Sequence, residues 1–176
     1  MERSEKEIFL AAKRGDIPAF EKIVLSHERA LFNYILRLSG STHDAEDLLQ
    51  ETLLKIYNSI KTYDTKRPFK TWAYTIATRS VYDFWRKKKV RKELLTLDED
   101  GADETFEDPD AYNKMERLGD LEMALKKIKP AYQSVLLLYY QEGFSYEEIS
   151  SMLGIPLNTI KTNLRRAKLE LKKILS

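Results

Sequence analysis

Cationic side chains recur at helical spacing near the end of the sequence, where they could neutralise phosphate charge. Six Lys or Arg residues and one acidic residue, Glu170, lie between Lys161 and Lys173. Neutralised phosphates release counterions from DNA, and an Arg side chain can donate two parallel hydrogen bonds to guanine. A basic helix alone is more often just a solvated surface. Here it follows a recognisable turn, and the combination favours DNA binding.

Two short helices joined by this turn are predicted to position the cations. Ser145 and Glu148 have the spacing of a capping box, which starts a helix. Gly154 can adopt the left-handed conformation that ends it, and Pro156 suits the first turn of the next helix. The pattern predicts a helix-turn-helix, whose second helix has an apolar stripe with basic side chains one position further round. The stripe consists of Ile160, Leu164, Ala167, Leu171 and Ile174.

A second basic cluster, Arg79 to Lys92, is interleaved with aromatic side chains. It contains seven basic residues and one acidic residue, Asp83. Basic grooves with stacking rings are typical of proteins that hold unpaired bases. Tyr63, in the turn before Pro68, is the ring that we most expect to be free. The candidate contacts to single-stranded DNA are Tyr63, Lys66, Arg67, Lys70, Arg79 and Arg86.

The same cluster also has a purely structural interpretation, which the sequence leaves open. Phe69, Trp72 and Phe84 lie at helical spacing and are expected to belong to the hydrophobic core. The run 87–89, three consecutive lysines, fits the solvated end of a helix equally well.

The composition predicts a helical protein without disulfides or membrane spans. Of 176 residues, 43% are hydrophobic and 33% are charged, with a net charge of +2 and no Cys. The absence of Cys fits a reducing cytosol. The first residues lack the apolar region of a signal peptide, and the longest strongly apolar run, "SVLLLYY", is too short to cross a bilayer. We therefore expect a cytoplasmic protein without membrane insertion.

The helical pattern divides the chain into two small domains, which predicts an all-α fold. Helices are expected at 4–13, 18–38, 42–60 and 68–94, and again from residue 118 onward. Between Asp98 and Asp110 there are eight acidic residues and no basic ones. Such a segment cannot bury enough apolar surface to offset the entropy of ordering it. The expected domains are 1–94 and 116–176, joined by an acidic flexible linker at 95–115.

Three segments of the chain follow one another in a specific order. They are "DAEDLLQETLLKIY", "RPFKTWAYTIATRSVYDFWRKKK" and "YQSVLLLYYQEGFSYEEISSMLGIPLNTIKTNLRRAKLEL". In this order they resemble the polymerase-binding, minus-ten and minus-thirty-five segments of the bacterial extracytoplasmic-function sigma factors. These are small sigma subunits of RNA polymerase in the sigma-70 family. The resemblance spans nearly the whole chain and implies DNA recognition and strand opening together with core polymerase, without catalysis by the chain itself.

The resemblance implies a division of labour between the two domains. The first would bind the clamp of the largest polymerase subunit, and its loop 63–67 would receive a base flipped from the non-template strand. The linker would lie in the RNA channel, and the second domain would read the major groove and contact the polymerase flap. An anti-sigma factor is a further expected partner. The implied polymerase contacts are Asp44, Glu46, Asp47, Gln50 and Glu51. The implied duplex contacts are Asn158, Thr159, Lys161, Thr162, Arg165, Arg166 and Lys168.

Three positions depart from the family pattern. Many members have Gly at the position of Asn158 and a basic residue at that of Asn163. The family usually has Asn at the position of Arg79, where it helps to line the flipped-base pocket. These departures bear on the promoter sequence that is recognised rather than on the class of protein.

Two interpretations from other classes compete with this one. A stand-alone helix-turn-helix regulator would bind duplex DNA without polymerase and would not need the first two segments. A helical hydrolase would use the carboxylates at 44–51 as a metal site. The two His residues, His27 and His43, lack metal-ligand spacing, and Asp44 and Glu46 point to different helix faces. We therefore expect no catalytic residue, metal or cofactor.

Overall fold

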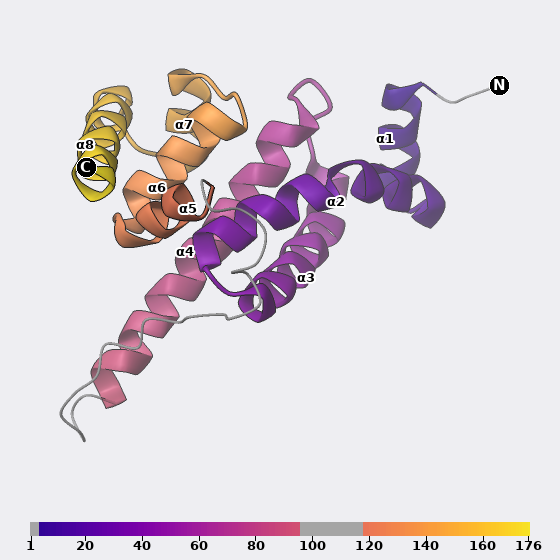
Figure 1. The fold of residues 1–176 in the computed structure, drawn as a ribbon. Helices are drawn as coiled ribbons and strands as arrows, with labels where there is room; N and C mark the ends of the chain where they lie inside the picture. The colour runs from indigo at the N-terminus through magenta and orange to yellow at the C-terminus, as the bar shows by residue number, and fades with distance from the viewer. Residues whose placement is uncertain (1–3, 96–117) are drawn as a thin grey trace.

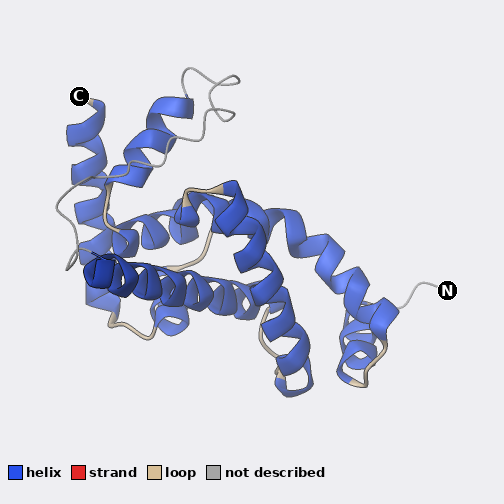
Figure 2. Cartoon of the chain, turned by 90° about the horizontal axis from the view of Figure 1, so that it is seen from below, coloured by secondary structure: helices blue, strands red, loops and turns tan. Residues whose placement is uncertain are grey.

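The computed structural model describes residues 4–95 and 118–176, and each regular element within these two ranges is a helix (Figure 1, Figure 2). The first range contains α1 (Glu5–Lys13), α2 (Ile17–Ser39), α3 (Thr42–Ser59), the short 3-10 turn η1 (Ile60–Thr62) and α4 (Phe69–Leu95). The second contains α5 (Leu118–Lys127), α6 (Pro130–Leu136), the π-helical turn η3 (Leu137–Gln141), α7 (Tyr146–Leu153) and α8 (Leu157–Leu175). The predicted all-α fold is confirmed.

Local sequence explains where the first helices begin and end. Ser4 forms a capping box with Glu7 at the start of α1. The Asp16 side chain accepts a hydrogen bond of 3.0 Å from the N–H of Ala19 and so caps α2. Gly40 ends α2 with φ of +76°, a left-handed conformation that is strained for a residue with a Cβ atom. The predicted bounds of α1 to α4 are correct to within one residue.

The core of the N-terminal unit forms where α2, α3 and α4 pack together (Figure 1). Leu31 of α2, Ile56 of α3 and Val81 of α4 each have at most 1% of their surface exposed. Tyr34 is buried among them, and its hydroxyl shares a hydrogen bond of 2.8 Å with the hydroxyl of Thr78. Burial raises the pKa of Tyr34, so the phenol stays neutral in the core.

The C-terminal unit consists of α5 to α8, and its buried apolar side chains belong to the same core cluster as those of the N-terminal unit. Val135, Leu138, Ile149 and Ile160 come from four successive elements, and each is fully buried. The helix that begins at Pro130 continues into the π-helical turn η3 rather than ending as regular α-helix. The helical pattern predicted from residue 118 onward is confirmed.

The two units pack against each other, with α4 beside α7 and α2 beside α5 and α6. Two buried polar residues of α6 have their partners across this contact. The Gln133 amide donates to the Arg37 carbonyl at 2.7 Å, and the hydroxyls of Ser134 and Tyr82 lie 2.5 Å apart. Buried polar groups need such partners. The interior of the C-terminal unit is thus completed by groups from the N-terminal unit.

Lys70, in the first turn of α4, is a second polar link between the units. Its Nζ donates to the backbone carbonyl of Glu142 at 2.7 Å and lies 3.4 Å from the carboxylate of the same residue. The ammonium also lies 5.6 Å from the ring centre of Tyr74 and 5.1 Å from that of Phe144. Burial, together with the charge of Glu142, raises the pKa of Tyr74. Lys70 is therefore held by the C-terminal unit.

The predicted linker contributes one residue to the described structure, Leu95, which ends α4. The remainder of the linker, residues 96–115, lies outside the described residues. The two-domain division therefore stays a prediction. No helix within 4–95 and 118–176 is both long enough and apolar enough to cross a membrane.

Candidate nucleic-acid interface

The turn between α7 and α8 has the geometry of a helix-turn-helix. The Ser145 hydroxyl accepts the N–H of Glu148 at 3.1 Å, and the Glu148 carboxylate accepts the N–H of Ser145 at 2.8 Å. The predicted capping box is therefore present. Gly154 ends α7 with φ of +68°, as predicted. Pro156 lies just before α8, as its N-cap residue, rather than inside the first turn.

One face of α8 is buried against the rest of the C-terminal unit. Ile160, Leu164, Ala167 and Leu171 are buried, as the apolar stripe predicted. Ile174, near the end of the helix, is 37% exposed and so lies outside the core. The stripe fixes which side of α8 faces solvent.

The exposed side of α8 carries the predicted duplex contacts. A shallow hollow on this side is lined by Lys161, Thr162, Arg165 and Arg166. All seven predicted contacts are exposed: Asn158, Thr159, Lys161, Thr162, Arg165, Arg166 and Lys168. A helix with one buried stripe and an exposed cationic face has the form of a recognition helix for the major groove.

The cations of α8 differ in how firmly the protein holds them. Arg166 donates to the Tyr132 hydroxyl at 3.4 Å, and Lys168 lies 5.0 Å from the ring centre of Tyr140. Interaction with the Tyr140 hydroxyl raises the pKa of Lys168. Lys161 and Arg165 make no hydrogen bond or ion pair with any residue that the structure describes. These two side chains are the least constrained on the face.

The ring of Tyr63 is buried, so the expectation that it is free is wrong. Only 3% of Tyr63 is exposed. Its ring centre lies 5.5 Å from that of Phe9, 5.7 Å from that of Phe69 and 4.8 Å from that of Trp72. Burial raises the pKa of Tyr63. The turn before Pro68 gave no sign that α1, far away in the sequence, would cover this ring.

The loop after Tyr63 presents charged side chains to solvent. Asp64, Lys66 and Arg67 are all exposed. The N–H of Lys66 donates to Oδ1 of Asp64 at 3.0 Å, and the N–H of Arg67 donates to the Asp64 carbonyl at 3.0 Å. These bonds make a compact turn that places two cations next to each other in sequence at its surface.

The other predicted single-strand contacts lie on different faces of α4. At about 100° per residue, Lys70 and Arg79 are about 180° apart around the helix, whereas Arg86 is nearly in line with Arg79. Lys70 faces the C-terminal unit, while Arg79 and Arg86 are exposed. Arg86 is bonded to Asp83 at 2.8 Å. The six predicted residues therefore do not form one continuous surface.

The aromatic residues of α4 are mainly structural. Phe69 is buried, which confirms its prediction as core, and Trp72 and Phe84 are half-buried and pack against the core. Lys88, in the lysine run, lies 5.4 Å from the ring centre of Phe84 and 3.8 Å from Asp44 of α3. This Lys therefore contacts the neighbouring helix instead of only solvent.

The predicted polymerase-binding residues lie on the outer side of α3. Asp44 is half-buried beside Lys88, and the other four are exposed. Two of these four pair with neighbours on the same helix: Asp47 with His43 at 3.8 Å and Glu51 with Lys55 at 2.6 Å. The remaining two, Glu46 and Gln50, have no hydrogen bond or ion pair to a residue of the described ranges.

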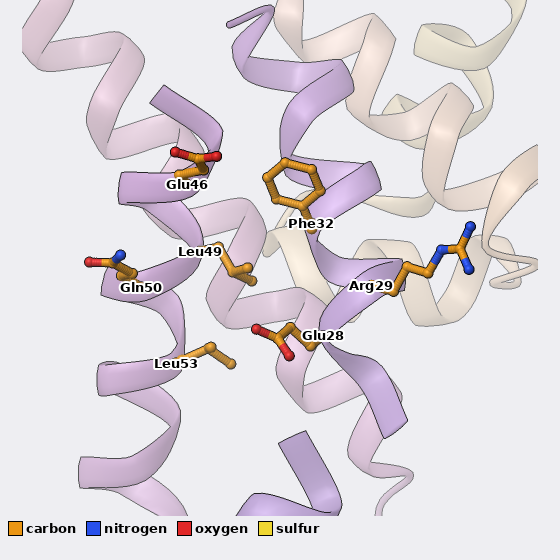
Figure 3. A pocket seen from close by; sticks show the side chains of 7 residues that line it. All are labelled: Glu28, Arg29, Phe32, Glu46, Leu49, Gln50 and Leu53. Atoms are coloured by element: carbon orange, nitrogen blue, oxygen red, sulfur yellow. The ribbon is translucent and has the colours of Figure 1, made fainter. Parts of the chain in front are cut away.

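Glu46 and Gln50 border a hollow between α2 and α3 (Figure 3). In Figure 3, Phe32 and Glu28 of α2 and Leu49 and Leu53 of α3 point into the space between the helices. Arg29 and Gln50 point outward on the two sides. The complete lining is Glu28, Arg29, Phe32, Glu46, Leu49, Gln50 and Leu53. The hollow thus has an apolar floor with charged and amide groups around it.

The contribution of α2 to this hollow was not predicted from the sequence. A signal was present, because Leu25 and Phe32 are seven residues apart and lie off the stripe that forms the core of α2. Leu25 is 73% exposed, and Leu54 of α3 is 63% exposed. Leu25 lies one helical turn before Glu28 and Leu54 one turn after Gln50, and both Glu28 and Gln50 line the hollow. An apolar surface beside a hollow suits a protein partner.

Within residues 4–95 and 118–176 no group of three or more His, Cys, Asp or Glu side chains is arranged to hold a metal ion. Of the α3 carboxylates, Asp47 and Glu51 pair with neighbours on their own helix and Asp44 lies 3.8 Å from Lys88 of α4. The hydrolase interpretation therefore has no geometric support in the described part of the chain.

Comparison with known families identifies both halves of the chain. Residues 23–91 match the model of Sigma-70 region 2, and residues 118–171 match that of Sigma-70 region 4. The ECF RNA polymerase sigma factor SigW of Bacillus subtilis is 32% identical, with 98% of this chain and 97% of the relative covered. SigE of Mycolicibacterium smegmatis is 33% identical over 91% of this chain, which spans 63% of the length of that relative.

Solved structures show the same architecture. The sigma factor RpoE in complex with the anti-sigma factor NepR from Bartonella quintana matches with a TM-score of 0.73 and 28% identity, covering 89% of this chain and 96% of that one. CnrH, solved with the cytosolic domain of CnrY, matches in fold with a TM-score of 0.68 and 21% identity, covering 96% of this chain and 94% of that one.

Proposed function

The chain belongs to the extracytoplasmic-function sigma factors of the sigma-70 family, and we propose that it binds core RNA polymerase, directs it to promoters and helps to open the DNA. The family is one of transcription initiation factors rather than of catalytic enzymes. The observation that carries the proposal is the presence of region 2 and region 4 in one chain, with an exposed cationic helix in the latter. A stand-alone regulator would need region 4 alone, so this alternative gains no support.

The exposed face of α8 is proposed to read the minus-thirty-five element in the major groove. Lys161 and Arg165 are the least constrained cations and line the hollow of this face. Arg165 suits a bidentate contact to guanine. Arg166 and Lys168 are held toward Tyr132 and Tyr140, a placement that suits phosphate contacts at the edge of the groove.

The outer side of α3 is proposed to bind the clamp of the largest polymerase subunit. Glu46 and Gln50 carry acceptor groups that pair with no described side chain, and the adjoining hollow has an apolar floor. Carboxylate and amide oxygens suit Arg side chains of a partner, while Phe32 and Leu53 can accommodate its apolar groups. The C-terminal unit is proposed to contact the polymerase flap.

The loop 64–67 and α4 are proposed to hold the opened minus-ten strand. Lys66, Arg67, Arg79 and Arg86 are exposed and cationic, which suits phosphates or base edges of single-stranded DNA. Lys70 can join them only after it leaves Glu142. Tyr63, being buried, is left out of the direct contacts.

A further partner is proposed by analogy. The RpoE relative was solved with an anti-sigma factor, and we extend that kind of partner to this chain. The proposal places the protein in the cytoplasm, where its polymerase works. It requires no cofactor.

Run-off transcription from a library of randomised promoters tests the function. We expect transcripts from a limited set of sequences when the chain is combined with core polymerase, and none from core alone. Sequence-specific duplex binding without core, accompanied by no transcripts with it, would instead identify a stand-alone regulator.

A charge reversal tests the polymerase site separately. Glu46→Lys should weaken core binding about tenfold or more, because it places a like charge opposite the proposed Arg partner. The matched control is Glu21→Lys, which reverses an exposed acid near the start of α2. Equal core affinity of the two variants in a sedimentation or biolayer assay would exclude the α3 face.

A further inference from the structure

Tyr63 is hydrogen-bonded both to the loop that follows it and to helix α1. These bonds suggest a structural role for Tyr63 in place of base stacking. We propose that Lys13 and Tyr63 are positioning residues, which hold the loop 64–67 in the shape that receives an unpaired base. The inference rests on the proposed function, because it presumes that this loop meets the opened minus-ten strand. Neither residue touches the DNA in this proposal.

The first link runs across the loop itself. The Tyr63 hydroxyl donates to the Arg67 carbonyl at 2.5 Å, so one side chain joins the residue just before the loop to the last residue of the loop. The ring that carries this hydroxyl is fixed by Phe69 and Trp72 of α4. The loop therefore has its two ends tied to one buried group.

The second link comes from α1. Lys13, the last residue of that helix, donates from Nζ to the Tyr63 carbonyl at 2.5 Å. Phe9, one turn earlier, contacts the rings of Tyr63 and Phe69 at 5.5 and 5.1 Å between centres. Helix α1 packs on α2 and on η1, so it braces the turn from outside the loop.

The position of α1 in the chain sharpens the inference. Residues 5–13 precede the segment that matches region 2, which begins at residue 23. The brace is thus supplied from outside the matched segment and acts on a loop within it. Phe9 and Ala12 are buried, which accounts for the packing of α1. The packing of these apolar side chains does not explain why Lys13 donates to the Tyr63 carbonyl.

Preorganisation is the expected benefit. A loop that already has its bound shape loses less conformational entropy when it receives a base. Lys66 and Arg67 are the exposed cations whose placement depends on the backbone between residues 63 and 67. Loosening that backbone should reduce the rate of strand opening and the preference for one base, while binding through α3 and α8 is unaffected.

Two variants remove the hydrogen bonds and keep the packing. Lys13→Met deletes the donor with nearly the same side-chain length, and Tyr63→Phe deletes the hydroxyl but retains the ring. Lys6→Met and Tyr57→Phe are the matched controls, because both residues are exposed. Lys13→Arg keeps a donor and should recover most of the lost function.

The assay is open-complex formation by the full chain with core polymerase, on promoters whose minus-ten strand carries 2-aminopurine. We expect opening about three- to tenfold slower and a weaker base preference for both variants, with core affinity and duplex affinity within twofold of wild type. Thermal unfolding checks that each variant is folded.

Three outcomes would overturn the inference. Unchanged opening and base preference in both variants would show that the hydrogen bonds of Lys13 and Tyr63 do not affect the loop's function. Equal losses of opening, core binding and duplex binding, or no recovery by Lys13→Arg, would show a merely structural role. If the wild-type chain with core opens no promoter, the proposed function fails first, and this inference falls with it.

Discussion

Helix α8, the proposed recognition helix, and the long helix α4 carry similar basic residues in different states. On α8, Lys161 and Arg165 are exposed and make no hydrogen bond or ion pair with the described residues. On α4, Lys70 is bonded to Glu142 and Arg86 to Asp83. The proposed duplex-reading surface therefore has exposed cations that no described residue pairs with. The proposed surface for the opened strand is partly engaged in contacts within the chain.

The contact between Lys70 and Glu142 also limits how far apart the two proposed DNA surfaces can lie. The minus-ten and minus-thirty-five elements are about 25 base pairs apart, which is about 85 Å of duplex at about 3.4 Å per base pair. Helix α8, with 19 residues, is about 29 Å long. Because Lys70 is bonded to Glu142, just before α7, we expect that the two proposed DNA surfaces do not reach both elements while this contact holds. Promoter binding should therefore separate the two units.

The largest expected effect is on α8. Arg165→Ala should remove about 1–3 kcal/mol of discrimination at one base pair of the duplex element, or about 5- to 150-fold in relative affinity. The reason is that a bidentate Arg–guanine contact cannot be replaced by Ala or by water without loss. Competition binding with single-base variants of the selected promoter measures it.

Lys172 supplies the control on the same helix. It is exposed two turns further along, and Lys172→Ala should weaken binding evenly across sequences and reduce the salt dependence. Equal, sequence-independent losses from both substitutions would mean that α8 grips phosphates and does not read bases.

A smaller effect is expected at the contact between the units. Glu142→Gln removes the charge beside Lys70 but keeps the backbone acceptor, so it should loosen the contact by about 1 kcal/mol, or about fivefold in the equilibrium. The chain has no native Cys, so dyes on Asn58→Cys and Lys173→Cys can report the distance between α3 and α8 by energy transfer. Glu147→Gln, an exposed acid on α7, is the control.

Substitutions at the two ends of the Lys70–Glu142 contact should change DNA binding by the free chain in opposite directions. Glu142→Gln should raise the affinity for a single-stranded minus-ten oligonucleotide a few-fold, because Lys70 becomes available. Lys70→Met should also loosen the contact but lower that affinity, because the cation is lost. Changes of the same sign would mean that Lys70 serves the contact between the units and not the DNA.

The sequence was most informative where one short segment determines its own conformation. The capping box at Ser145, the left-handed Gly154 and the apolar stripe of α8 depend on residues within one or two helical turns of each other, and apart from Ile174 these predictions are confirmed. The helix bounds around Gly40 were predictable for the same reason. Local hydrogen bonding and periodicity suffice for such features.

The sequence was least informative where distant segments meet. Tyr63 is buried because Phe9 and Trp72 enclose it, and Lys70 is engaged because Glu142 lies opposite it. Neither contact leaves a periodic trace in the sequence. The hollow beside Glu46 likewise depends on Phe32 of another helix. Exposure of a side chain at a binding surface is a property of tertiary packing, which composition and spacing do not fix.

Arg79 is the cation of α4 that most resembles Lys161 and Arg165 of α8 in its surroundings, and the smallest expected effect concerns it. It is exposed, and it makes no hydrogen bond or ion pair with any described residue. It lies seven residues after Trp72, hence on nearly the same face of α4 and about 10 Å further along. Trp72 packs on Tyr63, so Arg79 is on the side of the helix that borders the loop 64–67.

The chemistry of this position predicts a change in base preference and little change in overall activity. The Asn that the family usually has here can donate and accept, whereas Arg only donates and carries a fixed charge. Arg suits guanine or a phosphate and leaves the amino group of adenine without an acceptor. Arg79→Asn should therefore shift the bases selected from a library randomised at the minus-ten element, and should reduce the salt dependence by about one phosphate contact. If wild type and Arg79→Asn select the same sequences with the same salt dependence, Arg79 is a solvated side chain, and the base is read by the loop alone.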